Sequence, residues 1–238
     1  KFELLVGDDF PRMPCTKQPK DAHREKNVPR AWPLSACVAR PVGKKERLAN
    51  PKAQAALDKE LRTLEGRNTW DKTVVREWDE VAAEARRWKY IVHLGYLHGL
   101  TFEKGSELPI NHPQRKFKGR FVFLGNQVKN QDFEAAIFQD LGSSPATMEA
   151  AKNADAYACI AGNSSEQADA RQAYVQADLK GAPTWVSLPR EAWPKHWFGM
   201  RNPVCPLVKA LYGHPDAGTF WEEHCDLHCR TVGFGPIQ

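Results

Sequence analysis

Asp169-Ala-Arg-Gln-Ala-Tyr-Val-Gln-Ala-Asp-Leu179 sets one carboxylate five positions ahead of one tyrosine. The segment follows a polar turn and precedes Pro183-Thr-Trp-Val-Ser-Leu-Pro189, whose β-branched and aromatic residues predict a short strand. Asp169 can act as a metal ligand or lie as a solvated carboxylate in a turn. Tyr174 can face a ligand or pack in the core with its hydroxyl at the surface. Residues elsewhere in the chain distinguish between these interpretations.

The composition predicts a folded, mildly basic chain. Its 238 residues are enough for one large domain or two small ones, and 42% apolar residues with 8 Trp and 11 Phe exclude a disordered chain. The net charge of +5 and the pI of 8.9 are compatible with a polyanionic partner. No run approaches the roughly 20 apolar residues that cross a bilayer. The N-terminus also lacks a signal-peptide pattern, so we expect an intracellular protein, cytoplasmic or nuclear, with no membrane partner.

Hydrophobic periodicity and capping residues predict helices and strands without a βαβ repeat. Asn50 and Pro51 begin a helix that ends near Gly66. The later expectations are a strand after residue 68, a charged helix near 79–86, a strand near 88–94, a helix from Ser144-Pro145 to about Ala161, a loop or short helix over 190–202, a strand over 204–208 and a helix from about Asp216 to Thr231. This order favours an α+β fold over a doubly wound sheet.

Residues 1–47 are rich in Pro, Lys and Arg and predict a partly irregular N-terminal linker or extension, whereas residues 48–238 predict the folded domain. Within the extension, Leu5-Val-Gly-Asp-Asp9 resembles a metal-binding turn, because two adjacent carboxylates can hold Mg²⁺. A two-residue motif is common by chance, so an ordinary Gly-Asp turn is the favoured interpretation. The chain begins with Lys and ends without a terminating pattern, and we expect it to be a piece of a longer protein.

Arg115-Lys-Phe-Lys-Gly-Arg-Phe-Val-Phe-Leu124 alternates cations with aromatic residues. In a strand, this alternation puts Lys116, Lys118 and Arg120 on one face and the phenylalanines nearer the other. A row of cations suits a triphosphate or a nucleic-acid backbone. The alternative is a solvated strand face whose charges protect an exposed sheet edge.

A second cluster lies on the last predicted helix, where His224 and His228, and likewise Cys225 and Cys229, are one turn apart. Such side chains can bind zinc. Neighbouring positions point about 100° apart, so all four do not converge on one ion without a partner from elsewhere, and helix packing is the favoured role. The six cysteines of the chain include no Cys-x-x-Cys pair, so we expect free thiols.

Six short motifs follow one another over most of the chain. They are Lys59-Glu60 with Asn68-Thr-Trp70, Lys118-Gly-Arg-Phe-Val122, Ser144-Pro145, Asp169 to Leu179, Trp185 to Pro189, and Val204-Cys-Pro-Leu-Val-Lys-Ala-Leu-Tyr-Gly213 through Trp221. On these motifs, the region from about Leu48 to Phe234 resembles the reverse transcriptase of copia-type retrotransposon polyproteins, whose own motifs include Lys-Ala-Arg-Leu-Val and Leu-Tyr-Gly. Each match alone is weak, and the shared order is the specific signal.

The resemblance implies a right-hand polymerase fold, of which this chain carries the fingers and the first part of the palm. It implies a nucleotidyltransferase, an RNA-directed DNA polymerase that adds dNTPs to a primer. The implied cofactor is Mg²⁺, or Mn²⁺ in its place, because two metal ions held by several carboxylates suit in-line phosphoryl transfer. The implied partners are an RNA template, a DNA primer, dNTPs and the remainder of the Pol polyprotein.

The same resemblance implies roles for individual residues. Asp169 is the first metal ligand, at the end of a palm strand. Lys118 and Arg120 match residues that grip the incoming triphosphate, and Ala170 brings a backbone group close to it. Tyr174 matches the steric gate, where an aromatic ring excludes a ribose 2′-hydroxyl.

Two departures from the family pattern limit the implied activity. The resemblance places Gly213 in a turn near the templating base and the nucleotide. Asp216 stands where the family has Gln, and an acid there would repel a triphosphate unless it faces away. The Tyr-x-Asp-Asp hairpin is absent, so Asp169 makes an incomplete Mg²⁺ site and we expect the isolated chain to be inactive. The alternatives are a degenerate or domesticated fragment that binds nucleic acid or protein without catalysis, and a generic α+β nucleotide-binding domain.

Overall fold

The computed structural model describes residues 39–138, 146–166 and 168–235. The described unit begins at Ala39, and the Gly-Asp-Asp turn at Asp8 and Asp9 lies outside the described residues. Residues 39–47, expected to belong to the irregular extension, instead form strand β1 (Ala39–Pro41) and most of helix α1 (Lys44–Ala49). The folded unit therefore begins before residue 48.

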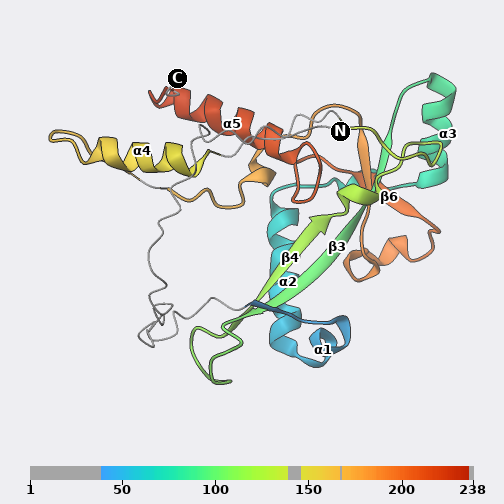
Figure 1. Ribbon diagram of the computed structural model, residues 1–238. Helices are drawn as coiled ribbons and strands as arrows, with labels where there is room; N and C mark the ends of the chain where they lie inside the picture. The colour runs from blue at the N-terminus through green and yellow to red at the C-terminus, as the bar shows by residue number, and fades with distance from the viewer. Residues whose placement is uncertain (1–38, 139–145, 167, 236–238) are drawn as a thin grey trace, which may run out of the picture. The chain divides into compact units, whose positions relative to one another are not determined.

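Five helices and six strands follow one another along the described residues (Figure 1). After β1 and α1 they are α2 (Pro51–Gly66), β2 (Arg76–Glu77), α3 (Trp78–Trp88), β3 (His93–Lys104), β4 (Lys116–Phe123), α4 (Met148–Ala158), β5 (Thr184–Ser187), β6 (Pro203–Pro206) and α5 (Ala217–Thr231). Short 3-10 turns lie at Lys72–Val74, Gly125–Gln127, Tyr174–Gln176, Arg190–Ala192 and Lys195–Trp197. The strands form a mixed six-stranded sheet, which confirms the α+β class predicted from the sequence.

Strand β3 connects the two parts of the sheet, because its two halves pair differently. Residues 93–96 run parallel to β5, and the remainder pairs antiparallel with β4 and, at its end, with β1. β5 continues antiparallel to β6, and β6 to β2, which gives the order β1-β3-β5-β6-β2 with β4 on β3. The long β3–β4 hairpin is thus continuous with the inner strands.

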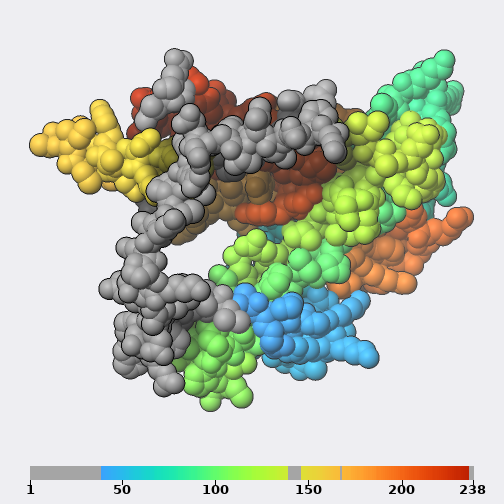
Figure 2. All heavy atoms as spheres, viewed as in Figure 1, coloured from blue at the N-terminus to red at the C-terminus, as the bar shows by residue number. Residues whose placement is uncertain are grey.

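Helix α2 packs its backbone against β4. Asn50 caps this helix as predicted, since its side-chain oxygen accepts hydrogen bonds from the backbone N–H groups of Lys52 and Ala53. A Cβ at Gly119 of β4 would lie 2.5 Å from the Cα of Leu57, so the approach requires glycine. Leu57 and Phe121 are buried together in the main core. Figure 2 shows the blue residues of α1 and α2 against the green end of the hairpin.

The predicted strand near residues 88–94 is wrong in its boundaries, because Trp88 still belongs to α3 and β3 begins at His93. The buried residues of α3 recur with a helical period, which outweighs the β-propensity of its aromatic residues; they are Trp78, Val81, Ala82 and Ala85. Lys89 then ends the helix in the left-handed conformation, with φ at 56°.

Helix α4 is shorter than predicted, and its apolar face is not buried. The Thr147 hydroxyl caps it by accepting from the backbone N–H of Ala150 at 3.1 Å, and the helix ends at Ala158 rather than near Ala161. The expected start at Ser144-Pro145 lies outside the described residues. None of the helix's own residues is buried. Among the described helices, none is both long and apolar enough to span a membrane.

Candidate functional site

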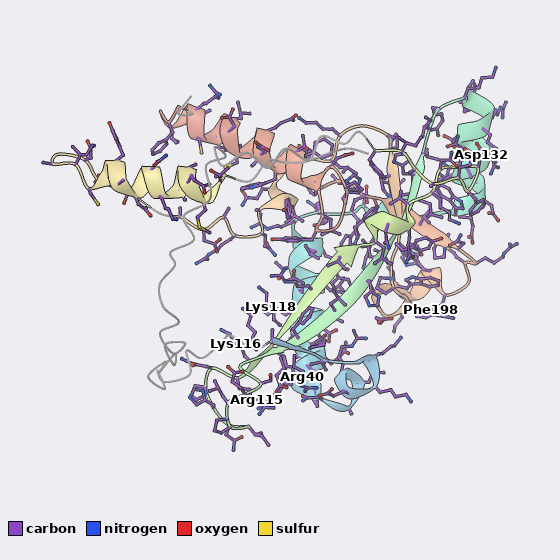
Figure 3. All side chains as sticks on the ribbon, in the orientation of Figure 1. Arg40, Arg115, Lys116, Lys118, Asp132 and Phe198 are labelled. Atoms are coloured by element: carbon purple, nitrogen blue, oxygen red, sulfur yellow. The ribbon has the colours of Figure 1, made fainter. Side chains whose placement is uncertain are left out.

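The outer face of β4 carries the cations that the sequence predicts there. Lys116, Lys118 and Arg120 are exposed, whereas Phe121 and Phe123 are buried, so the predicted alternation is confirmed. The pairing register extends this face onto β3, because Lys104 lies opposite Lys116, Phe102 opposite Lys118 and Leu100 opposite Arg120. In Figure 3, Lys116 and Lys118 lie along the hairpin near the end where Arg40 and Arg115 are labelled.

The cations on this face repel one another. Partial burial lowers the pKa of Lys118, and Arg120, Lys104 and Lys116 lower it further. Glu60 of α2 acts in the opposite direction on Lys118, although burial raises the pKa of Glu60 itself. An anion bound at this face would relieve the repulsion, which is the property expected of a phosphate-binding surface.

The turn Leu211-Tyr212-Gly213 is held against the end of β4. The backbone N–H of Phe123 donates to the carbonyl of Tyr212 at 2.7 Å. Gly213 has φ at 90°, and a Cβ there would lie 2.1 Å from the carbonyl oxygen of Phe123. A Cβ at Gly125 would in turn lie 2.2 Å from the carbonyl oxygen of Gly213. Two glycines therefore allow the turn and the strand end to touch through their backbones.

This turn brings three of the sequence motifs together. The guanidinium of Arg120 lies over the ring of Tyr212, 5.5 Å from its centroid. The rings of Tyr212 and Tyr174 meet edge to face, with centroids 4.6 Å apart and planes at 87°. Arg120 and Tyr174, which both were predicted site residues, thus share Tyr212 as a neighbour. Tyr212 belongs to the motif that ends at Gly213, and the sequence alone predicts no role for it.

The resemblance predicts Asp169 at the end of a strand, and this prediction is wrong. Asp169 and Ala170 lie in an exposed irregular segment. Gln172 adopts a left-handed conformation with φ at 54°, and the Gln176 side-chain amide donates to the carbonyl of Arg171 at 2.8 Å. These features close a turn that leads into the 3-10 turn at Tyr174–Gln176. Within the described part of the chain, the Asp169 carboxylate has no hydrogen-bond or ion-pair partner. Nearby Asp178 instead pairs with Lys209 at 2.6 Å.

Asp216 precedes α5 without capping it by a side-chain hydrogen bond, and burial raises the pKa of its carboxyl. Its backbone N–H donates to Nδ1 of His214 at 3.2 Å. His214 is buried, and burial followed by the charge of His93 lowers its pKa to about 4. The Nε2 atom of His214 is buried without a hydrogen-bond partner among the described residues.

His93, Phe138 and His214 form an aromatic cluster that the sequence did not predict. The ring of Phe138 lies 5.0 Å from that of His93 and 5.3 Å from that of His214, measured between centroids. A cavity of about 320 Å³ opens beside this cluster, lined by His93, Ile91, Ile137, Phe138, Gly181, Ala182, Asp216, Thr219 and Phe220. Its lining residues come from four segments of the chain, and no local pattern links them.

The described residues do not fit a two-metal polymerase centre. They contain no group of three or more His, Cys, Asp or Glu side chains that could hold one metal ion. Asp169 is the one predicted carboxylate ligand, and it is exposed rather than grouped with others. The described residues therefore do not supply a complete metal centre for nucleotidyl transfer.

No protein-family model matches this chain, and neither a curated protein nor a solved structure is similar enough to count as a match. The functional interpretation therefore depends on the residues themselves and on which of them the fold brings together.

Proposed function

We propose that the chain is the fingers and first palm segment of a reverse transcriptase, an RNA-directed DNA polymerase of the copia-type retrotransposon class. The observation that carries this proposal is the meeting of Arg120, Tyr212 and Tyr174. They belong to three motifs that are far apart in the sequence, and a chance combination of short motifs gives no reason for them to meet.

In this proposal, Arg120 and Lys118 bind the phosphates of the incoming dNTP and of the nucleic-acid backbone. Both are exposed on β4, among neighbouring cations that an anion would stabilise. A guanidinium makes two parallel hydrogen bonds to a phosphate, whereas an ammonium acts as a point charge. Tyr212 orients the guanidinium of Arg120 over its ring without neutralising it.

Tyr174 selects deoxynucleotides in this proposal. Its edge-to-face contact with Tyr212 restricts the movement of its ring, and a ring that cannot retreat excludes a ribose 2′-hydroxyl by steric clash. Ala170 would offer a backbone group to the nucleotide, and Asp169 would offer one metal-binding carboxylate. Gly213 and Asp216 would lie at the nucleotide end of the Leu-Tyr-Gly turn.

A second candidate function is a non-catalytic nucleic-acid or protein binder derived from such an enzyme. The exposed position of Asp169 favours it, since the described residues contain no group of three or more side chains that could hold a metal ion there. The cationic face of β4 would bind nucleic acid in both functions, and the two differ in whether the intact protein catalyses nucleotide addition.

The experiment that tests nucleic-acid binding is a salt titration of an RNA–DNA primer–template, followed by fluorescence anisotropy. Lys118→Ala and Arg120→Ala should each weaken binding and reduce the slope of log K against log salt by about 0.7–0.9, the value for one lost phosphate contact. Lys195→Ala removes an exposed lysine of the Lys195–Trp197 turn and serves as the charge-matched control. If all three variants had the wild-type slope, phosphate binding at β4 would be wrong.

A further inference from the structure

The second half of helix α5 has two histidines that were expected to help pack the helix. His228 is exposed and His224 is half-buried, and their neighbours Leu227 and Val232 are 60% and 71% exposed. His224 and Cys225 are thus partly buried, as the packing role predicts, whereas His228 and Cys229 are exposed. Another role for the histidines has to explain their spacing.

The two histidines lie on one face of α5 and already touch. They are four positions apart, so their side chains are one helical turn apart. Their ring centroids are 4.2 Å apart, and the planes are tilted by 34°. One helical turn is also the spacing at which the two histidines of a His-Glu-x-x-His helix hold one zinc ion.

The hydrogen bonding of His228 leaves the correct nitrogen for a metal. Its Nδ1 lies 2.8 Å from the backbone carbonyl oxygen of His224. A carbonyl oxygen only accepts, so Nδ1 carries the proton and donates, and the neutral ring keeps its lone pair on Nε2. Metal-binding histidines commonly donate their second ring N–H to a backbone carbonyl in this way.

His224 keeps both of its ring nitrogens available for a ligand. Within the described ranges, neither ring nitrogen of His224 has a hydrogen-bond partner. Lys209 and Asp178, which both act on His224 electrostatically, pair with each other at 2.6 Å.

We infer that His224 and His228 form a two-histidine chelate on the surface of α5 that binds a divalent transition metal of the imidazole-preferring class, Cu²⁺, Ni²⁺ or Zn²⁺, through Nε2 of His228 and one ring nitrogen of His224. The remaining coordination positions belong to water, because the described residues contain no group of three such ligands. Oxygen-preferring Mg²⁺ would not compete for this site.

The adjacent cysteines are the alternative ligands. Burial raises the pKa of the Cys225 thiol, and a hydrogen bond with Cys229 raises it further, so a metal bound at Cys225 has to displace a proton. A thiolate chelate would select softer ions and would give Co²⁺ an intense sulfur-to-metal absorption that imidazole ligands lack.

The experiment is a titration of the reduced full chain with Ni²⁺, Cu²⁺ and Co²⁺ against a competing chelator, with calorimetry for stoichiometry and absorption for ligand type. We expect one ion per chain, affinity rising from Co²⁺ through Ni²⁺ to Cu²⁺, and no sulfur-to-metal band. His224→Ala with His228→Ala should weaken Ni²⁺ binding by at least about tenfold, the lower end of the loss caused by changing even an outer partner of a metal ligand.

Two controls separate this chelate from general histidine content. His98→Ala with His196→Ala removes two exposed histidines from other elements and should leave the affinity unchanged. Asp226→His with His228→Asp keeps the composition of α5 but sets the two histidines two positions apart, on opposite faces, and should lose the site. Circular dichroism checks that the helix is retained.

Three outcomes would overturn the inference. They are the absence of saturable binding, wild-type affinity in the variant that lacks both His224 and His228, and a sulfur-to-metal band that disappears in Cys225→Ser with Cys229→Ser. The last result would assign the metal to the cysteines instead.

Discussion

At the scale of single residues, the clearest constraint is on glycines at which a Cβ atom would overlap with neighbouring backbone. Gly213 combines a positive φ with a carbonyl oxygen 2.1 Å from where its Cβ would be. Gly181 has nearly the same backbone conformation, with φ at 86°, but has nothing within 4 Å of a Cβ. Comparing substitutions at these two glycines therefore distinguishes the cost of backbone strain from the cost of steric overlap.

Gly213→Ala should destabilise the protein by about 3 kcal/mol or more, because strain and overlap with the end of β4 add. Gly181→Ala should cost only the strain, about 1–2 kcal/mol. Urea unfolding monitored by Trp fluorescence measures both. Equal losses would mean that the Leu-Tyr-Gly turn does not press against Phe123.

His214 should make stability depend on pH. Its pKa is about 4 in the folded protein against 6.5 for the ordinary group, so the unfolded chain binds the proton more readily. The stabilisation is complete above about pH 6.5 and is lost as the pH falls toward 4, and the difference corresponds to about 3 kcal/mol. Burial lowers the pKa of His93 too, which acts in the same direction.

The measurement compares the free energy of unfolding at pH 7 and pH 4.5 in the wild type and in His214→Phe, which keeps an aromatic ring against Phe138. The variant should lose less stability on acidification than the wild type. The same loss in both proteins would show that His214 is not the titrating group.

At the scale of elements, the helices differ in how much their N-terminal caps should contribute to global stability. α2 is capped by Asn50 and packs on β4, whereas α4 is capped by Thr147 and has no buried residue. A cap should change the free energy of global unfolding only where its helix packs on the core.

Asn50→Ala should lower the free energy of unfolding by about 1 kcal/mol, because two backbone N–H groups lose their acceptor. Thr147→Ala removes a comparable cap from α4 and should leave global stability unchanged while exchange of the α4 amides becomes faster. Hydrogen exchange with denaturant unfolding tests both, and a global loss in Thr147→Ala would show that α4 packs.

Local signals predicted the elements well where caps and periodicity agree. Asn50-Pro51, the alternation of β4 and the helix before Gly233 were all readable, since each depends on neighbours in sequence. The end of α3 could not be predicted from the sequence, because helices that end in a left-handed conformation usually have glycine there. In α3 that position is Lys89. The contact of Arg120 with Tyr212, and the cluster of His93 with His214, depend on the sheet order and have no local signature.

At the scale of the whole molecule, both proposed functions predict that this chain alone does not catalyse nucleotide addition. Residues 1–238 should not extend a DNA primer on an RNA template with dNTPs and Mg²⁺ or Mn²⁺, because one carboxylate cannot assemble a two-metal centre. Primer extension resolved by gel electrophoresis tests this, with a known polymerase as positive control. Extension that disappears in Asp169→Asn would contradict the expectation and assign catalysis to this chain.

The continuity of β3 also constrains how this chain can vary. One uninterrupted strand carries the parallel pairing with β5 and the antiparallel pairing with β4. Deleting one residue near Leu97 would leave the first pairing in place and shift the second by one position, so Leu100, Phe102 and Lys104 would exchange faces with their neighbours. Insertions and deletions should therefore be tolerated in the loop between β3 and β4 and selected against within β3. The positions at which related sequences differ in length would then show which residues must keep a fixed pairing register.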